Sequence, residues 1–394
     1  MIDPQTTPPE NAPHAMRVAL AHDWLVGYRG GEMVLDAIAR LLLSQGHTIS
    51  RIYTMFDNAA PLSPTLDALP RATSALNRYP ESLRRWLLPR YPAAVAELGR
   101  ALTRDHAREP IDLLISTSSS AIKSIAPPAG VPHLCYCHSP ARYLWSQTDS
   151  YASPDLKGRL RALGLASFAP RLRDWDRQTA TNVTRFIANS THTAREIERC
   201  YQRDSVVIHP PVRTDFFSRD PGVQREDHLL LVSALEPYKR VELGIDAAIR
   251  LNRRLVIVGS GSHEHALRAK ARKSQLITFA GKVSDEQLRD HYRRARAFLF
   301  PQIEDFGITA VEAQGCGCPV VARHAGGALD SVIDARTGSF FEEPTPEALA
   351  EAINRCPQPQ NCAEECVANA QRFSHERFTS QIGEQILNPL HNSE

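Results

Sequence analysis

Short apolar runs that alternate with helical patterns constrain the fold of this chain most strongly. The first half has such runs at residues 18–21, 113–116 and 134–136, and a helical pattern at 31–43. Uninterrupted apolar runs of this length are typical of parallel strands buried on both faces, with helices on either side of the sheet. We therefore expect an α/β fold.

The same alternation restarts in the second half, with a helical pattern at 241–251 and apolar runs at 229–232, 255–259, 277–279, 297–300 and 319–322. A chain of 394 residues exceeds what one hydrophobic core usually organises, so we expect two domains. Pro210 and Pro211 between the halves disfavour helix and central strand, and indicate a hinge.

These boundaries predict an N-terminal Rossmann-like domain at 16–208, a hinge at 209–225 and a C-terminal Rossmann-like domain at 226–372. Residues 373–394 form a terminal helix, which can either stay on the second domain or return to the first. Residues 1–15 are rich in Pro, Thr and Asn and are expected to form a disordered extension, with Met16 as an alternative start. Two such domains facing each other turn the carboxyl ends of both sheets toward one cleft, which suits a diphosphate ligand.

Composition excludes several classes of function. The formal charge is only +2 with both signs interspersed, so we expect no nucleic-acid partner. No segment reaches about 18 uninterrupted apolar residues and no secretion signal precedes the first strand, so we expect a cytoplasmic protein. The eight cysteines show no zinc-finger spacing, and we interpret them as small buried side chains.

The segment after the run at 297–300 is the most informative for chemistry. Glu304 and Glu312 stand eight residues apart, separated by Phe306, Gly307 and Ile308. A helix that begins near Gly307 would direct its unpaired N–H groups toward a phosphate, and Glu312 would then reach toward a pair of sugar hydroxyls. Taken alone, the pattern is also compatible with an acidic helix cap.

A basic element follows the first strand of the second half. Lys239 and Arg240 lie where a strand turns into a helix, and a lysine there can neutralise a diphosphate leaving group. The alternative is a solvated surface lysine.

Together these segments resemble family 4 of the retaining glycosyltransferases, which have the GT-B fold, and the resemblance extends from Met16 to about Phe378. It implies that Glu304 lies at the transferred sugar, that Glu312 holds the ribose, and that Lys239 binds the diphosphate. The motifs at 22–32 and 137–143 resemble the glycine loop of the family and a segment with a histidine that touches the donor sugar.

The candidate catalytic residues are therefore Glu304, His138 and Lys239. The candidate donor-binding residues are Gly30, Gly31, Lys239, Arg240, Asp305, Phe306, Gly307, Ile308 and Glu312. No metal and no cofactor beyond the nucleotide sugar are expected. Asp174 and Asp176 mimic a metal-binding pair, but on a helix residues two apart point in different directions.

One position departs from the resemblance. The family often has an arginine five residues before the lysine, and Ala234 stands there. A missing donor to the leaving group commonly costs on the order of a hundredfold in rate, so we expect another cation to compensate, with Arg240 as the candidate.

The resemblance implies transfer of a hexose with retention at its anomeric carbon. It favours mannose from GDP-mannose over glucose from UDP-glucose, and a saccharide acceptor such as one linked to polyprenyl diphosphate, in polysaccharide or lipopolysaccharide synthesis. Cations mixed with apolar and aromatic residues at 84–91 and 157–161 predict peripheral contact with an anionic inner membrane, although such runs also occur on solvated faces. The alternatives are a nucleotide-sugar epimerase or hydrolase on the same fold, and a nucleotide-sugar binding protein without catalysis.

Overall fold

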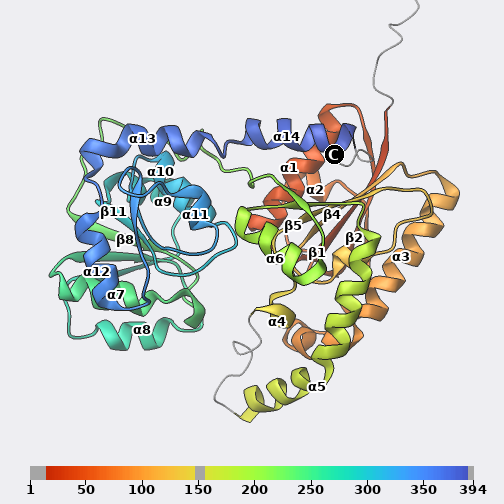
Figure 1. Ribbon diagram of the computed structural model, residues 1–394, viewed down its shortest axis with the longest axis horizontal. Coiled ribbons are helices and arrows are strands. Elements are labelled where there is room, and N and C mark those ends of the chain that lie inside the picture. Colours follow the sequence, from red (N-terminus) through yellow and green to blue (C-terminus); the bar gives the residue numbers. More distant parts are fainter. Residues whose placement is uncertain (1–14, 147–155, 389–394) are drawn as a thin grey trace, which may run out of the picture.

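The chain folds into two α/β domains joined by a linker and by a long C-terminal helical segment (Figure 1). The computed structural model describes residues 15–146 and 156–388, except for the side chains of 82, 85 and 156–166. The expected extension therefore lies almost entirely outside the described residues. Each domain holds one wholly parallel sheet, which confirms the predicted α/β architecture of two Rossmann-like domains.

The N-terminal sheet has seven strands in the order β3-β2-β1-β4-β5-β6-β7. Its strands are β1 (Arg17–Leu25), β2 (Thr48–Asp57), β3 (Arg71–Thr73), β4 (Leu113–Ser118), β5 (His133–Cys137), β6 (Arg185–Ala188) and β7 (Ser205–Val207). The order reverses between β1 and β4, and the loops that leave these two strands diverge to opposite faces. Such a switch point is where doubly wound sheets bind their ligands.

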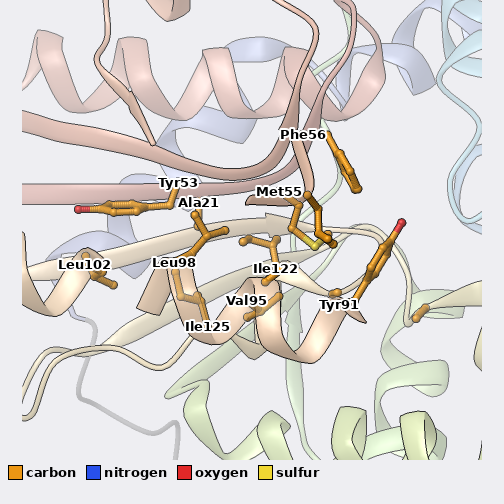
Figure 2. Close-up of a cluster of buried hydrophobic side chains, with 14 of the residues drawn as sticks. Ala21, Tyr53, Met55, Phe56, Tyr91, Val95, Leu98, Leu102, Ile122 and Ile125 are labelled. Atoms are coloured by element: carbon orange, nitrogen blue, oxygen red, sulfur yellow. The ribbon is translucent and has the colours of Figure 1, made fainter. Parts of the chain in front are cut away.

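Helices cover both faces of this sheet. They are α1 (Gly30–Ser44), α2 (Pro64–Asp67), α3 (Tyr91–Arg108), α4 (Arg142–Trp145), α5 (Leu156–Gln178) and α6 (Thr191–Tyr201). On one face, Val95, Leu98 and Leu102 of α3 pack into a cluster with Tyr53 and Ile122 (Figure 2). These side chains recur every three to four residues, which gives α3 one apolar face against the sheet.

The C-terminal sheet repeats this plan with six strands in the order β10-β9-β8-β11-β12-β13. Its strands are β8 (His228–Val232), β9 (Arg254–Val258), β10 (Ile277–Gly281), β11 (Ala297–Phe300), β12 (Val320–Arg323) and β13 (Gly338–Phe341). The covering helices are α7 (Val241–Arg250), α8 (Glu264–Ala271), α9 (Asp285–Arg294), α10 (Ile308–Gly315), α11 (Ala328–Ser331), α12 (Pro346–Arg355) and α13 (Pro359–Gln371). The switch point here lies between β8 and β11.

The last helix, α14 (His375–Leu387), crosses back to the N-terminal domain and lies along α1 (Figure 1). Its buried residues Phe378, Ile382 and Ile386 join the same apolar cluster as the core face of α1. Just before it, the amide of Val212 in the linker donates to the carbonyl of Phe373 at 2.9 Å. The chain therefore crosses between the domains twice, and the two crossings are bonded to each other.

No helix within the described residues is long and apolar enough to span a membrane. The basic and aromatic segment at 84–91 is partly buried: Arg84, Leu88 and Tyr91 are at most 8% exposed, and the Arg84 guanidinium lies over the ring of Phe56. These three residues pack inside the domain, whereas Trp86 in the same segment is 48% exposed, so the membrane contact of this segment stays a prediction. The side chains at 157–161 lie outside the described residues.

Candidate functional site

One large cleft separates the carboxyl ends of the two sheets. It has a volume of about 1570 Å³ and is lined from both domains. A cleft larger than the roughly 300–1,000 Å³ of an ordinary small-ligand pocket has room for two substrates. The loops after β1, β4, β8 and β11, which flank the two switch points, supply much of its wall.

The N-terminus of α1 forms one side of this cleft. The helix begins at Gly30, and the carboxylate of Glu32 in its first turn accepts the amide of Arg29 at 3.2 Å. A Cβ at Gly30 would lie 3.4 Å from Cδ1 of Ile308, the first residue of α10 in the other domain. Two helix N-termini thus meet across the cleft, and their positive dipole ends favour an anion between them.

His138 follows β5 and lies beside the glycine loop. A Cβ at Gly31 would be 3.7 Å from His138 Nε2 and 3.3 Å from Cε1 of His22, so both imidazoles pack closely against the start of α1. Burial, with the nearby His22 and Arg142, lowers the pKa of His138 to about 3, and its buried Nε2 has no hydrogen-bond partner among the described residues. At neutral pH this imidazole is uncharged and can hydrogen-bond a sugar hydroxyl.

Asp23, at the end of β1, holds the loop after β4 in place. Its Oδ2 accepts the amides of Ser119 and Ser120 at 2.6 and 2.9 Å, and its Oδ1 accepts those of Ala121 and Ile122 at 2.9 and 2.8 Å. Ser119 and Ser120 line the cleft. A buried carboxylate with four amide donors therefore fixes this part of the cleft wall.

Gly307 sets the shape of the loop before α10. It is the N-cap with φ of 91°, and a Cβ there would lie 2.6 Å from the ring of Phe300. A Cβ at Gly327 would come within 2.2 Å of the Cα of Phe306, so the loop at 326–327 supports the segment from behind. Close backbone contact thus positions the amides at the start of α10.

Two ion pairs occupy the centre of the cleft. Lys239, in the turn before α7, pairs with Glu304, and Arg142 of α4 pairs with Asp305. The side chains of Lys239 and Glu304 are only 14% and 17% exposed. When an anionic ligand enters this partly buried cleft, the lysine can pair with the ligand in place of the carboxylate.

The structure brings nearly all predicted site residues to this one cleft. Its lining includes the predicted residues Gly30, Gly31, His138, Lys239, Arg240, Glu304, Asp305, Phe306, Gly307 and Ile308. Arg240 is at the rim, with a side chain 53% exposed and 3.7 Å from Glu242. Sequence reasoning assigned no role to Asp23 or Arg142, although both stand in the motifs that it singled out.

Glu312 differs from the other predicted residues because it does not line the cleft. It is 6% exposed on α10 and accepts a hydrogen bond from the Tyr292 hydroxyl at 3.4 Å. Burial raises its pKa to about 7, and the charge of Arg213 opposes this shift. Its role at the ribose stays a prediction that requires the side chain to turn toward the nucleotide.

The pair Asp174 and Asp176 has no metal-binding geometry. Asp176 is buried and lies 3.0 Å from Lys123 Nζ, whereas Asp174 is exposed on the same helix. Among the described residues, no group of three or more potential ligands could hold a metal ion. All eight cysteines are buried and form no disulfide.

Two Rossmann-like domains that face each other across a cleft, with two helix N-termini and a lysine inside it, are the architecture of GT-B glycosyltransferases. A family model described as Glycosyltransferase Family 4 matches residues 28–216, and one described as Glycosyl transferases group 1 matches residues 212–373. The chain belongs to family 4 of the glycosyltransferases.

Relatives with assigned functions match part of the chain. D-inositol 3-phosphate glycosyltransferase 2 of Catenulispora acidiphila is 30% identical over 45% of this chain and 48% of its own length. The GDP-mannose-dependent alpha-(1-6)-phosphatidylinositol monomannoside mannosyltransferase of Mycolicibacterium smegmatis is 31% identical over 37% of this chain and 45% of its own length. The chain thus spans about half the length of these curated relatives.

Solved structures agree on the fold over almost the whole chain. Anabaena HepE in complex with UDP has a TM-score of 0.68 and 19% identity, and the match covers 94% of this chain and 99% of that protein. At this identity the similarity shows the fold alone.

Proposed function

We propose that this protein is a retaining hexosyltransferase that moves a hexose from a nucleoside diphosphate sugar to a saccharide acceptor. The observation that carries the proposal is the cleft centre, where the N-termini of α1 and α10 meet beside Lys239 and Glu304. Positive dipole ends and a lysine are the groups that stabilise a departing diphosphate.

The chemistry requires no protein nucleophile. The acceptor hydroxyl attacks from the face that the diphosphate leaves, and the departing phosphate accepts the hydroxyl proton. Lys239 stabilises the leaving group, and uncharged His138 hydrogen-bonds the donor sugar. Glu304 gives up Lys239 to the phosphate and turns to the transferred sugar. Catalysis is then mostly positioning, charge stabilisation and exclusion of water.

The favoured donor is GDP-mannose. A relative is named for dependence on GDP-mannose, whereas a protein of the same fold was crystallised with UDP, so both nucleotides belong in the test. Thermal unfolding with GDP, UDP, ADP and their sugar conjugates identifies the nucleotide, since a ligand at about a hundred times its Kd stabilises by roughly 2.7 kcal/mol. A selective rise with GDP and GDP-mannose supports the proposal, and a rise with another nucleotide replaces the donor.

The acceptor that we favour is a lipid-linked saccharide, such as one on polyprenyl diphosphate, with the enzyme in peripheral contact with an anionic membrane. Binding to vesicles with anionic lipid that is reversed by high salt supports the contact. Equal binding to neutral and anionic vesicles argues against it.

Glu304→Ala is the decisive variant for the assigned chemistry. We expect transfer to fall by at least about a hundredfold while the Kd of the nucleoside diphosphate changes far less, because Glu304 contacts the sugar and Lys239 stays. Equal loss of transfer and of nucleotide binding would contradict the role of Glu304. An assay without acceptor separates the alternatives: an epimerase or hydrolase consumes donor alone, and a binding protein consumes none in any mixture.

A further inference from the structure

Consecutive carboxylates in the loop after β11 each hold a cation from a different domain. Glu304 pairs with Lys239 of the C-terminal domain, and Asp305 pairs with Arg142 at the start of α4 in the N-terminal domain. The charge of Glu304 also acts on Arg142, so both cations lie within electrostatic range of the same carboxylate. Both line the cleft, as do Gly307 and Ile308 at the N-terminus of α10.

The Arg142 guanidinium has hydrogen-bonding capacity to spare. Asp305 accepts from a single nitrogen, Nη2, and the side chain forms no other hydrogen bond with the described residues. Burial lowers the pKa of Arg142, but Asp305, Glu304 and Tyr238 together raise it above its ordinary value, so these groups of the donor side all lie within electrostatic range. An arginine has five N–H donors, and most of those of Arg142 are available to a ligand in the cleft.

We propose that Arg142 is the second cation on the diphosphate of the donor, contributed by the N-terminal domain. The inference rests on the proposed function, because it assumes that a nucleoside diphosphate occupies the cleft. A diphosphate bound at α10 stands next to two carboxylates, and Lys239 balances only one of these charges. An arginine fork beside Lys239 supplies the missing charge and matches phosphate geometry with two parallel hydrogen bonds.

Arg240, the cation that the sequence suggested as a substitute for the missing arginine, is placed less well. Ala234 lines the cleft just after β8, where its methyl group offers no charge. Arg240 lies in the left-handed region with φ of 55°, and its side chain is half exposed at the rim, near Glu242. Arg142 is 31% exposed, so a charged contact there is stronger than one at the rim.

The test compares nucleoside diphosphates with monophosphates. Titration calorimetry measures the Kd of GDP and GMP, and of UDP and UMP, for the wild type and for Arg142→Ala. We expect the variant to lose about tenfold or more in affinity for the diphosphate, as for the loss of hydrogen bonds to a charged group, and less than about twofold for the monophosphate. Arg336→Ala, which removes a surface arginine that pairs with Glu365, is the control and keeps both affinities.

Two further variants separate ligand binding from a purely structural pair. Asp305→Asn removes the negative charge that competes for Arg142 but keeps the guanidinium, and it should retain or tighten diphosphate binding. The double variant Arg142→Ala with Asp305→Asn leaves no unpaired buried carboxylate at position 305. It should still lose the preference of the wild type for the nucleoside diphosphate over the monophosphate. If Arg142 only links the domains, Asp305→Asn will weaken diphosphate binding as much as Arg142→Ala does, and the proposal fails.

The two failures are distinguishable. A wild type that binds no nucleoside diphosphate overturns the proposed function together with this inference. A wild type that binds one, with an Arg142→Ala variant that loses monophosphate and diphosphate equally or loses neither, overturns only the inference.

Discussion

The substitution Asp23→Asn tests whether one buried carboxylate organises the cleft wall. Asp23 is 4% exposed, and its two oxygens accept four backbone amides of the loop after β4. Asparagine keeps one acceptor oxygen but turns an NH₂ group toward the other two amides. Two buried donors are then unsatisfied, at about 1–3 kcal/mol each, so the expected loss of stability is about 2–6 kcal/mol.

Thermal unfolding is the assay for this loss. One kcal/mol shifts the Tm of a domain of this size by about 2–4 °C, so the transition of the N-terminal domain should fall by roughly 5–20 °C. Asp174→Asn, at an exposed position, is the control and should change stability by less than about 0.5 kcal/mol. A loss below about 1 kcal/mol for Asp23→Asn would refute the assignment of these four hydrogen bonds as the anchor of the loop.

Two further predictions concern the C-terminal domain and the last helix. Burial raises the pKa of Glu312 to about 7 from its ordinary 4.5, so the wild type loses stability as the pH rises through this interval. Glu312→Gln lacks this loss and should be more stable than the wild type by up to about 3 kcal/mol at pH 8.5, with little difference at pH 4.5; parallel pH profiles from chemical unfolding would contradict it. Ile382→Ala should cost about 2–5 kcal/mol and expose α14 to proteases, because Ile382 is 2% exposed in the cluster with α1. The exposed Glu384→Ala is its control, and equal protease resistance of both variants would count against the docking of α14.

Local patterns in the sequence were enough to predict the central strands of both sheets, namely β1, β4 and β5 in the first and β8 to β12 in the second. Leu229–Leu231 and Phe298–Phe300 belong to apolar runs, and the structure has them in β8 and β11. The strand β2 was missed because its sequence mixes Thr, Ser and Arg among apolar residues. Its burial depends on the strands β1 and β3 that pair with it, which a local pattern does not show. At 84–91 a local pattern of cations and aromatics does not reveal which side chains turn inward, and the structure buries Arg84, Leu88 and Tyr91 but leaves Trp86 48% exposed.

Most of the candidate site was predictable because its residues follow strands. Glu304, Lys239 and His138 each come shortly after a strand whose carboxyl end faces the cleft. Contacts between distant segments were not predictable. Arg142 and Asp305 are separated by 163 residues, and Asp23 by 96 from Ser119, so only the fold shows that they are partners.

The most direct test of the central claim is the anomeric configuration of a transferred sugar. Wild-type protein is incubated with the nucleotide sugar that stabilises it and with a lipid-linked saccharide acceptor, and the product is examined by NMR. A new glycosidic bond with the anomeric configuration of the donor is the predicted result, with transfer lost in Glu304→Ala. A product of inverted configuration, or consumption of the donor with no glycosidic bond formed, would contradict the claim that this cleft performs retaining sugar transfer.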